Sequence, residues 1–185
     1  LKRLQSKIGI TTVYVTHDQS EALALSDQIA VIDRGRISQI GSQQDIYFRP
    51  ASPFVARFVG ATNLLTGRLI GAANGKAAVE VQGGRRIECL VLQTLDDPSS
   101  VSVSIRPESI QLVARAAHAP KAGENHLAGR ITGVTFLGAS RRVDVTSDGL
   151  NLQVTTSAEI PLPADNEVML TFALERAVAL PGKVS

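Results

Sequence analysis

The sequence predicts a mainly β protein that is preceded by a short α/β segment. Up to about residue 60, helix-like and strand-like stretches alternate along the chain. After this point, short stretches with the period of a strand follow one another between turn residues, which is typical of a barrel or a sandwich. The 44% of hydrophobic residues is sufficient for a real core. We therefore expect two domains, residues 1–60 and residues 61–185.

The opening residues predict a helix, a strand and a second helix. Residues 1–7 have the composition of the last turns of a helix, and Gly9 is a typical C-terminal stop. Residues 12–15 are β-branched and aromatic, which predicts a buried strand. Asp18 and Glu21 have the spacing of a capping box, so a helix should begin at this point.

His17 lies between this predicted strand and this predicted helix. A strand end, an imidazole and a helix N-terminus then meet at one point, which is favourable for a phosphate or another anion. By itself, a histidine after a strand is more often a structural or surface residue. We interpret Asp18 and Glu21 as helix caps rather than as two carboxylates for acid–base chemistry.

A hairpin and two short helices are predicted next. The apolar stretches 29–32 and 37–40 flank a tight turn, and Ser42 and Ser52 each have the context of an N-cap. The helix after Ser52 has four apolar residues on a face that we expect to be buried: Phe54, Val55, Phe58 and Val59. So few strands cannot form a parallel sheet that is covered on both faces. Since the chain starts at Leu1, we expect the rest of this sheet upstream, in a longer polypeptide.

Residues 61–185 have an almost continuous strand pattern. The predicted strands are residues 64–70, 77–82, 86–91, 101–105, 109–113, 127–137, 141–146, 150–155 and 168–172. Asn74-Gly75 and Asp148-Gly149 predict tight turns, because these residue types accept a positive φ. Residues 116–126 lack periodicity and bulk, which predicts a mobile connection between two halves of the β domain. The sequence has no heptads and no long exact repeat.

Composition and charge exclude several classes of protein. Lys+Arg 19 against Asp+Glu 17 gives a net charge of +2, which leaves no electrostatic footprint for nucleic acid or an anionic membrane. No apolar run approaches the roughly 20 residues that span a bilayer, and no stretch has the pattern of a signal peptide. The single cysteine, Cys89, excludes an internal disulfide and is typical of a reducing compartment. We expect a cytosolic protein.

Two motifs suggest chemistry that their context does not favour. GAANGKA at residues 71–77 is one residue too short for a phosphate loop and lies between two predicted strands, so we interpret it as a hairpin. Cys89, His118 and His126 lack the spacing of metal ligands, so we predict no metal site.

Three arginine-containing stretches leave alternatives open. The arginine pairs at 85–86 and 141–142 form either an anion-binding patch or, more commonly, caps of exposed strand ends. Arg-Pro-Glu at residues 106–108 either bridges subunits or domains, or forms a turn with an exposed ion pair.

Several stretches resemble the ATPases of ATP-binding cassette (ABC) importers. VTHDQSEA at residues 15–22 is similar to the switch-histidine segment of their nucleotide-binding domain, and residues 32–37 and 41–42 are similar to the hairpin after it. The remainder resembles the TOBE domain, an OB-like β domain of the sugar, polyamine, ferric-iron and sulfate branches, most clearly in IRPE at 105–108 and FLG at 136–138. The resemblance covers essentially the whole chain. It implies an OB-like barrel behind an incomplete α/β remnant of a nucleotide-binding domain.

For the complete protein, the resemblance implies that His17 contacts the γ-phosphate of ATP and helps to align the attacking water. ATP and Mg²⁺ would be the cofactors. The family's phosphate loop, glutamine loop, signature motif and carboxylates for magnesium and water have no counterpart in these 185 residues. We therefore expect the isolated chain to need no cofactor and to hydrolyse no ATP, because one imidazole supplies only a small part of the required stabilisation.

The family's arrangement also implies partners and a location. A bacterial importer ATPase would lie on the cytoplasmic face of the inner membrane, bound to permease subunits that work with a solute-binding protein. Its β domain would form a homodimer that regulates how the catalytic domains open and close. In isolation, residues 8–48 would expose strand edges and an apolar face, so we expect them to be disordered or packed against a second copy.

Two other functions belong to different classes. The β domain is alternatively a sensor of a small ligand or an oxyanion. An OB-type nucleic-acid binder is disfavoured, because the chain has no Trp and most of its two Tyr and five Phe lie before the β domain, outside any stacking surface.

Overall fold

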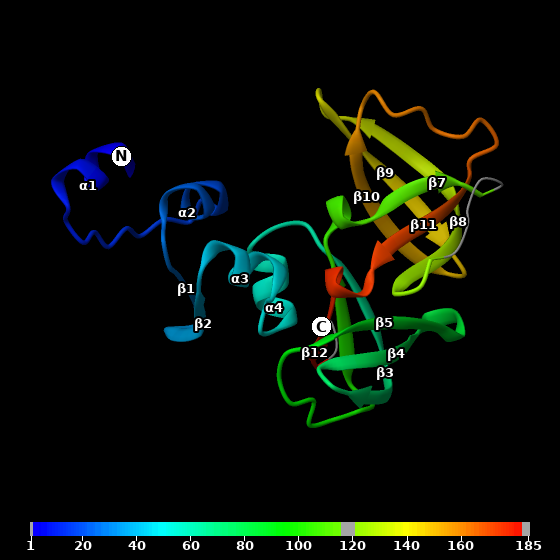
Figure 1. Ribbon diagram of the computed structural model, residues 1–185, viewed down its shortest axis with the longest axis horizontal. Helices are drawn as coiled ribbons and strands as arrows, with labels where there is room; N and C mark the ends of the chain where they lie inside the picture. Colours follow the sequence, from blue (N-terminus) through cyan, green and yellow to red (C-terminus); the bar gives the residue numbers. More distant parts are fainter. Residues whose placement is uncertain (1, 116–120, 183–185) are drawn as a thin grey trace.

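The computed structural model describes residues 2–115 and 121–182 (Figure 1). A helical segment with one hairpin is followed by two β units, a closed barrel and a five-stranded sheet. The helical segment extends to one side of the β units and has the N-terminus at its far end (Figure 1). The fold is therefore mainly β with a barrel, as the sequence predicts.

The N-terminal residues differ in one respect from the prediction. Helix α1 (Lys2–Ile8) ends at Gly9, as expected. Residues 12–15, however, are not a strand, and the side chains of Val13 and Val15 are 89% and 90% exposed. A strand needs a neighbouring strand for its backbone hydrogen bonds, and no strand among the described residues pairs with this segment.

The next elements follow the predicted order. Helix α2 (Gln19–Leu25) begins at the predicted cap, and β1 (Ile29–Asp33) and β2 (Arg36–Gly41) form the predicted hairpin. Several apolar side chains of this hairpin are exposed, in line with the expected uncovered face: Ile32, Ile37 and Ile40.

Two short helices, α3 (Gln43–Phe48) and α4 (Pro53–Phe58), complete this segment. The Oγ atoms of the predicted caps, Ser42 and Ser52, each accept a hydrogen bond of 3.2 Å from the backbone N–H three residues later. A small core is formed by one residue each of β1, α3 and α4 and by the C-cap residue of α4: Val31, Ile46, Val55 and Val59.

The predicted buried face of α4 is only half correct. Val55 and Val59 are buried, whereas Phe54 and Phe58 are exposed and stack on each other with ring centroids 5.6 Å apart. The valine pair and the phenylalanine pair lie about 100° apart around the helix axis, because each valine follows a phenylalanine by one residue. Because α4 packs on the small core with one side only, one pair is buried and the other faces outward.

The barrel closes in the strand order β12-β5-β4-β3-β6. Its strands are β3 (Asn63–Ala73), β4 (Lys76–Val81), β5 (Arg85–Val91), β6 (Val101–Ile105) and β12 (Ala177–Pro181). All neighbouring pairs are antiparallel except β12 with β5. The sequence did not predict β12, because its alanine-rich residues are weak strand formers and it ends in a proline.

The second unit has the strand order β10-β9-β8-β11-β7. Its strands are β7 (Gln111–Ala114), β8 (Glu124–Phe136), β9 (Ser140–Ser147), β10 (Leu150–Ser157) and β11 (Glu167–Ala173). The predicted mobile connection at 116–126 is wrong for residues 124–126, which belong to β8. Residues 116–120 of that connection lie outside the described residues.

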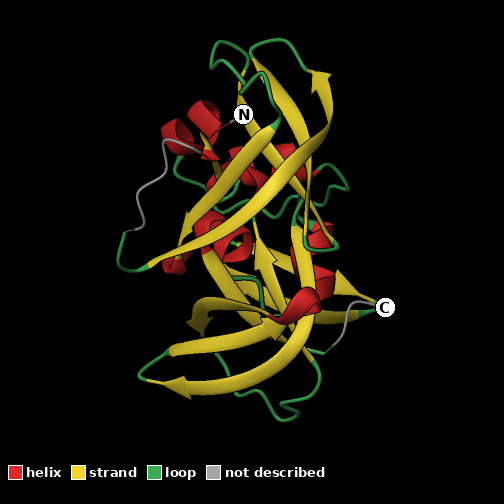
Figure 2. Cartoon of the chain, turned by 90° about the vertical axis from the view of Figure 1, so that its right-hand side faces the viewer, coloured by secondary structure: helices red, strands yellow, loops and turns green. Residues whose placement is uncertain are grey.

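Each unit contains one strand that follows directly, in the sequence, a strand of the other unit. After β6 of the barrel, the chain passes through a short 3₁₀ helix (Pro107–Ser109) and adds β7 to the second sheet. After β11 of the sheet, it passes through a similar turn (Leu174–Arg176) and adds β12 to the barrel. Apolar residues of both units form one continuous core, and Figure 2 shows the units one above the other.

The two units also repeat one sequence pattern. Residues 63–71 read NLLTGRLIG and residues 125–133 read NHLAGRITG. Both strands shift register just before the last glycine of the pattern, Gly71 in β3 and Gly133 in β8. The β region is thus an internal duplication. The repeat is hard to see in the sequence, because the two copies share only scattered residues within a short stretch.

The first residue of each repeat holds the two units together. Asn125, in β8, accepts from the backbone N–H of Glu88 at 2.7 Å and donates to its carbonyl oxygen at 2.8 Å. Asn63, in β3, makes the same two bonds with the backbone of Gln153, at 2.7 and 2.9 Å. Both asparagines are buried, so the seam between the units is fixed by two equivalent polar contacts.

Candidate functional site

His17, the predicted catalytic residue, lies at an exposed position two residues before α2. Its neighbour Asp18 caps the helix, because its Oδ1 accepts from the N–H groups of Ser20 at 2.7 Å and Glu21 at 3.0 Å. His17 is therefore held next to a capped helix N-terminus, as predicted. Its contact with a nucleotide stays a prediction.

The second half of the predicted capping box is wrong. Glu21 does not reach back to the N–H of Asp18, which instead donates to Thr16 Oγ1 at 2.9 Å. The Glu21 carboxylate accepts from Tyr14 Oη and Thr16 Oγ1, both at 2.9 Å. This carboxylate also raises the pKa of Tyr14 through its hydrogen bond and its charge. These contacts tie the extended segment before His17 to α2.

Arg106 joins the helical segment to the barrel. Only 3% of this residue is exposed. Its Nε and Nη2 donate to the carbonyl oxygen of Tyr47 at 2.9 and 2.8 Å, and its Nη1 donates to the carbonyl oxygens of Ala56, Gly60 and Ala61 at 3.0 to 3.1 Å. Of the two alternatives that the sequence leaves open, the structure therefore shows a bridge between parts of the chain and not an exposed turn.

Tyr47 completes this junction with its side chain. The guanidinium carbon of Arg106 lies 4.1 Å from the centre of the Tyr47 ring, and Tyr47 Oη donates to Glu108 Oε1 at 2.8 Å. Burial lowers the pKa of Arg106, while Tyr47 and Glu108 act in the opposite direction. Burial, followed by the Glu108 carboxylate, raises the pKa of Tyr47 to about 12. The sequence offered no signal for the role of Tyr47, because its partners are 59 and 61 positions away.

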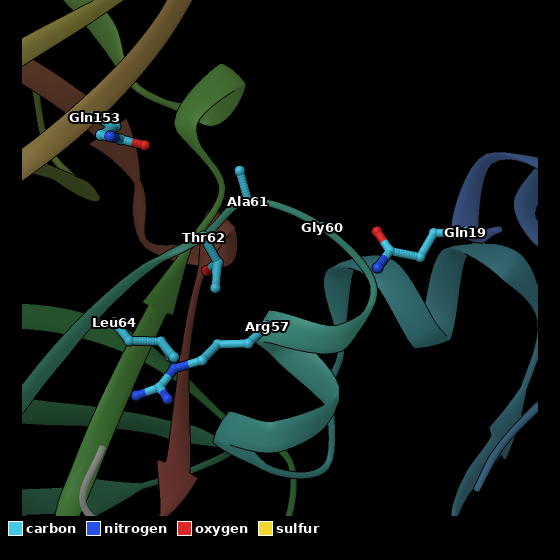
Figure 3. A pocket seen from close by; sticks show the side chains of 7 residues that line it. All are labelled: Gln19, Arg57, Gly60, Ala61, Thr62, Leu64 and Gln153. Carbon is cyan, nitrogen blue, oxygen red and sulfur yellow. The ribbon is translucent and has the colours of Figure 1, made fainter. Parts of the chain in front are cut away.

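A groove of about 530 Å³ runs between α2 and the start of the barrel. It is lined by Gln19, Arg57, Gly60, Ala61, Thr62, Leu64 and Gln153. Figure 3 shows Gln19 directed at the connection that contains Gly60, and Arg57 directed at Leu64. The lining combines a guanidinium, two amides and a hydroxyl with no carboxylate, which is a donor-rich environment for an anion.

A second groove of about 420 Å³ continues along the seam between the two β units. It shares Thr62, Leu64 and Gln153 with the first groove and also contains Asp144. The two grooves are therefore adjacent, and neither was predicted from the sequence.

The arginine pairs at 85–86 and 141–142 do not form one site. Arg85 pairs with Asp148 and Arg86 with Glu88, while Arg142 lies 4.0 Å from Asp144. The Nε and Nη2 atoms of Arg141 are buried and have no acceptor among the described residues.

The remaining candidate residues that the structure describes lie in strands and hairpins of the two β units. Cys89 is buried in β5, and burial raises the pKa of its thiol to about 12, so it is a poor nucleophile. GAANGKA forms the β3–β4 hairpin, as predicted. His126 Nε2 lies 3.3 Å from the carbonyl oxygen of Lys121, and His118 lies outside the described residues.

Within residues 2–115 and 121–182, no group of three or more His, Cys, Asp or Glu side chains has an arrangement that suits a metal ion. In the same part of the chain, every helix is too short or too polar to span a membrane.

Comparison with known proteins gives matches over most of the chain. The TOBE domain family matches residues 103–180. The spermidine/putrescine import ATP-binding protein of Mesorhizobium japonicum is 39% identical over 80% of this chain and 38% of its own length. Its counterpart in Thermobifida fusca is 37% identical over 98% of this chain and 48% of its own length. The Fe(3+) ions import ATP-binding protein of Rhizobium etli is 34% identical over 97% of this chain and 48% of its own length.

Among solved structures, the cytoplasmic molybdate-binding protein ModG has a similar fold, with a TM-score of 0.54 and 15% sequence identity. The match covers 66% of this chain and 96% of ModG. The chain spans less than half the length of the import proteins that it matches. With its TOBE match and its mainly β fold, the chain corresponds to the C-terminal portion of an ABC importer ATPase.

Proposed function

We propose that this chain is the regulatory and dimerising part of the ATP-hydrolysing subunit of an ABC importer. The junction at Arg106 carries the proposal. A regulatory domain has to move with the catalytic domain that it controls, and Arg106 ties residues 47–61 to the barrel through four carbonyl oxygens. Such a buried, multiply bonded cation is a rigid link, because releasing it would leave several polar groups without partners.

A continuous set of packed residues supports this proposal. Leu23 of α2 packs against the small core that contains Val31 and Ile46, and so does Tyr47. Tyr47 in turn lies beneath Arg106. Side chains in direct contact thus connect α2 with Arg106, and we expect a displacement of α2 to move the barrel with it.

In the complete subunit, His17 would contact the γ-phosphate of ATP, with Mg²⁺ as the second cofactor. The subunit would work as a homodimer on the cytoplasmic face of the membrane, with permease subunits and a solute-binding protein. Import is the activity that the names of the matched relatives state for those proteins. Hydrolysis would supply the energy for uptake.

The test uses the complete subunit assembled with its permease. His17→Ala should lower kcat for ATP hydrolysis by about 100-fold, the typical loss of one transition-state contact. Arg106→Met should leave basal hydrolysis within about twofold but lower the solute transported per ATP by about tenfold, within the usual range of coupling between sites. Arg68→Met, an exposed arginine of the barrel, is the matched control. Unchanged coupling in a folded Arg106→Met protein would contradict the proposal.

A second candidate function is the sensing of a small oxyanion by the β domain. The donor-rich groove beside Arg57 favours it, and the fold likeness to a protein described as molybdate-binding is consistent with it. In calorimetry, molybdate, sulfate or phosphate should bind with a Kd of about 1 mM or tighter. Arg57→Gln should weaken binding about tenfold, whereas Arg68→Gln should not. Absence of saturable heat for all three anions would exclude this function.

A further inference from the structure

Glu21 holds two side chains that lie on the other side of His17 in the sequence. Its Oε2 atom accepts hydrogen bonds from Tyr14 Oη and from Thr16 Oγ1, both at 2.9 Å. Glu21 belongs to the first turn of α2, whereas Tyr14 and Thr16 belong to the extended segment that precedes the helix. One carboxylate oxygen therefore closes a loop of the chain around His17.

The backbone on both sides of His17 is fixed through the same hydroxyl. Thr16 Oγ1 donates to Glu21 and accepts from the N–H of Asp18 at 2.9 Å. Asp18 in turn accepts, through its Oδ1, from the N–H groups of Ser20 and Glu21 at 2.7 and 3.0 Å. The residues directly before and after His17 are thus both bonded to α2.

Packing contributes little to the position of His17. This residue is exposed, and the side chains of Val13 and Val15 are 89% and 90% exposed. In an extended segment alternate residues share one side, so the two residues bonded to Glu21 face α2 while the two valines face away from it. Among the described residues, the side-chain hydrogen bonds to Glu21 are therefore the contacts that hold this segment on α2.

The Glu21 carboxylate is not engaged elsewhere, because it makes no ion pair within residues 2–115 and 121–182. Hydrogen bonds to a charged acceptor are roughly twice as strong as those between neutral groups. The carboxylate also raises the pKa of Tyr14, through its hydrogen bond first and its charge second. The phenol therefore stays a donor to Glu21 above the pH at which a free tyrosine ionises.

We propose that Glu21 is the positioning residue of His17 in the reaction of the complete subunit. By holding Tyr14 and Thr16 on α2, its carboxylate fixes the backbone from which the imidazole reaches the γ-phosphate of ATP. A misplacement of about 1 Å is sufficient to cost an enzyme a large part of its rate. This inference rests on the proposed function of His17 and adds the group that orients it.

NMR relaxation of the backbone amides, measured on the chain itself, tests the positioning. In the wild type, the order parameter of the His17 amide should be about 0.85, the value of rigid backbone, and Glu21→Ala should lower it below about 0.6. Thr16→Val should have the same effect, because it removes the shared hydroxyl, whereas Thr16→Ser should keep the wild-type value. The same order parameter in the wild type and in Glu21→Ala would overturn the proposal.

Asp27→Asn is the matched control for these measurements. Asp27 is an exposed carboxylate just after α2, and its partner, Lys2, lies in α1 at 3.4 Å. Its replacement should leave the order parameter of His17 unchanged. Unchanged amide signals from the β strands verify that each variant is folded.

The kinetics of the complete subunit, assembled with its permease, test whether this position matters for the reaction. Glu21→Ala should lower kcat for ATP hydrolysis about tenfold and leave KM for ATP within about twofold, because it displaces His17 without removing it. In a His17→Ala background, Glu21→Ala should cause no further loss, since a positioning residue acts only through the residue that it holds. A further loss of about tenfold in that background would overturn the positioning role.

The outcomes separate this inference from the proposed function. Full kcat in His17→Ala would overturn the proposed contact of His17, and the positioning in catalysis with it. Full kcat in Glu21→Ala, next to a loss of about 100-fold in His17→Ala, would overturn the positioning alone.

Discussion

The guanidinium of Arg106 donates two hydrogen bonds to the carbonyl oxygen of Tyr47 and lies over the ring of the same residue at 4.1 Å. One side chain of the barrel thus holds both the backbone and the side chain of α3. Three further carbonyl oxygens, of Ala56, Gly60 and Ala61, are satisfied by the same group. One cation thus bonds to four carbonyl oxygens of the helical segment and of the connection that leads to the barrel.

Replacing Arg106 should destabilise the protein strongly. Arg106→Met removes all of these bonds and leaves buried carbonyl oxygens without donors, at an expected cost of about 3 kcal/mol in the free energy of unfolding. Arg68→Met, whose partner Glu80 lies on the surface, should cost less than about 0.5 kcal/mol. Urea denaturation measures the free energy of unfolding of both variants. Similar midpoints for the two variants would show that the junction contributes no stability.

Stability should decrease in alkaline solution. The pKa of Tyr47 rises from an ordinary value of 10.0 to about 12, and that of Cys89 from 9.0 to about 12. Both groups keep their protons longer in the folded protein, so their contribution is complete below the unfolded pKa and is lost as pH rises through the folded pKa. The free energy of unfolding should therefore fall between about pH 9 and pH 12.

Urea titrations at several pH values measure the slope of the free energy of unfolding against pH. Tyr47→Phe should flatten it above about pH 10, and Cys89→Ala should flatten it from about pH 9. A slope that neither substitution changes would assign the alkaline loss to other groups.

The two asparagines of the repeat should be energetically equivalent. Asn63→Ala and Asn125→Ala each remove two hydrogen bonds across the seam and leave a backbone N–H and C=O unpaired. We expect each to cost about 2 kcal/mol in thermal or chemical unfolding. Asn151→Ala, at an exposed position of β10, should cost less than about 0.5 kcal/mol. A large difference between the two repeat positions would argue against their equivalence.

Two glycines of β3 should differ sharply in their tolerance of a methyl group. A Cβ at Gly67 would lie 2.4 Å from the carbonyl oxygen of Glu80, whereas a Cβ at Gly71 would meet no atom within 4 Å. Gly67→Ala should therefore cost about 2–3 kcal/mol, because the barrel backbone has to move. Gly71→Ala should be close to neutral. Equal midpoints in urea would contradict the tight packing of β3 on β4.

Local signals were the reliable part of the sequence. The caps at Asp18, Ser42 and Ser52 are present where predicted, because a cap involves only a side chain and the next two or three N–H groups. The Asn74-Gly75 turn is equally local. The strand expected at 12–15 failed for the opposite reason, since its composition suits a sheet but no described strand lies beside it.

By itself, the sequence determined the order of the elements, the mainly β class, the helix starts and the resemblance of the segment around His17, because periodicity, capping and turn chemistry act over a few residues. Only the tertiary structure decided which strands share a barrel, that β12 belongs to it, and that the two β units are repeats. It alone showed the hydrogen bonds between Arg106 and residues 47–61 and the grooves beside Gln153. Those features join residues dozens of positions apart, and their formation depends on the packing of the whole chain.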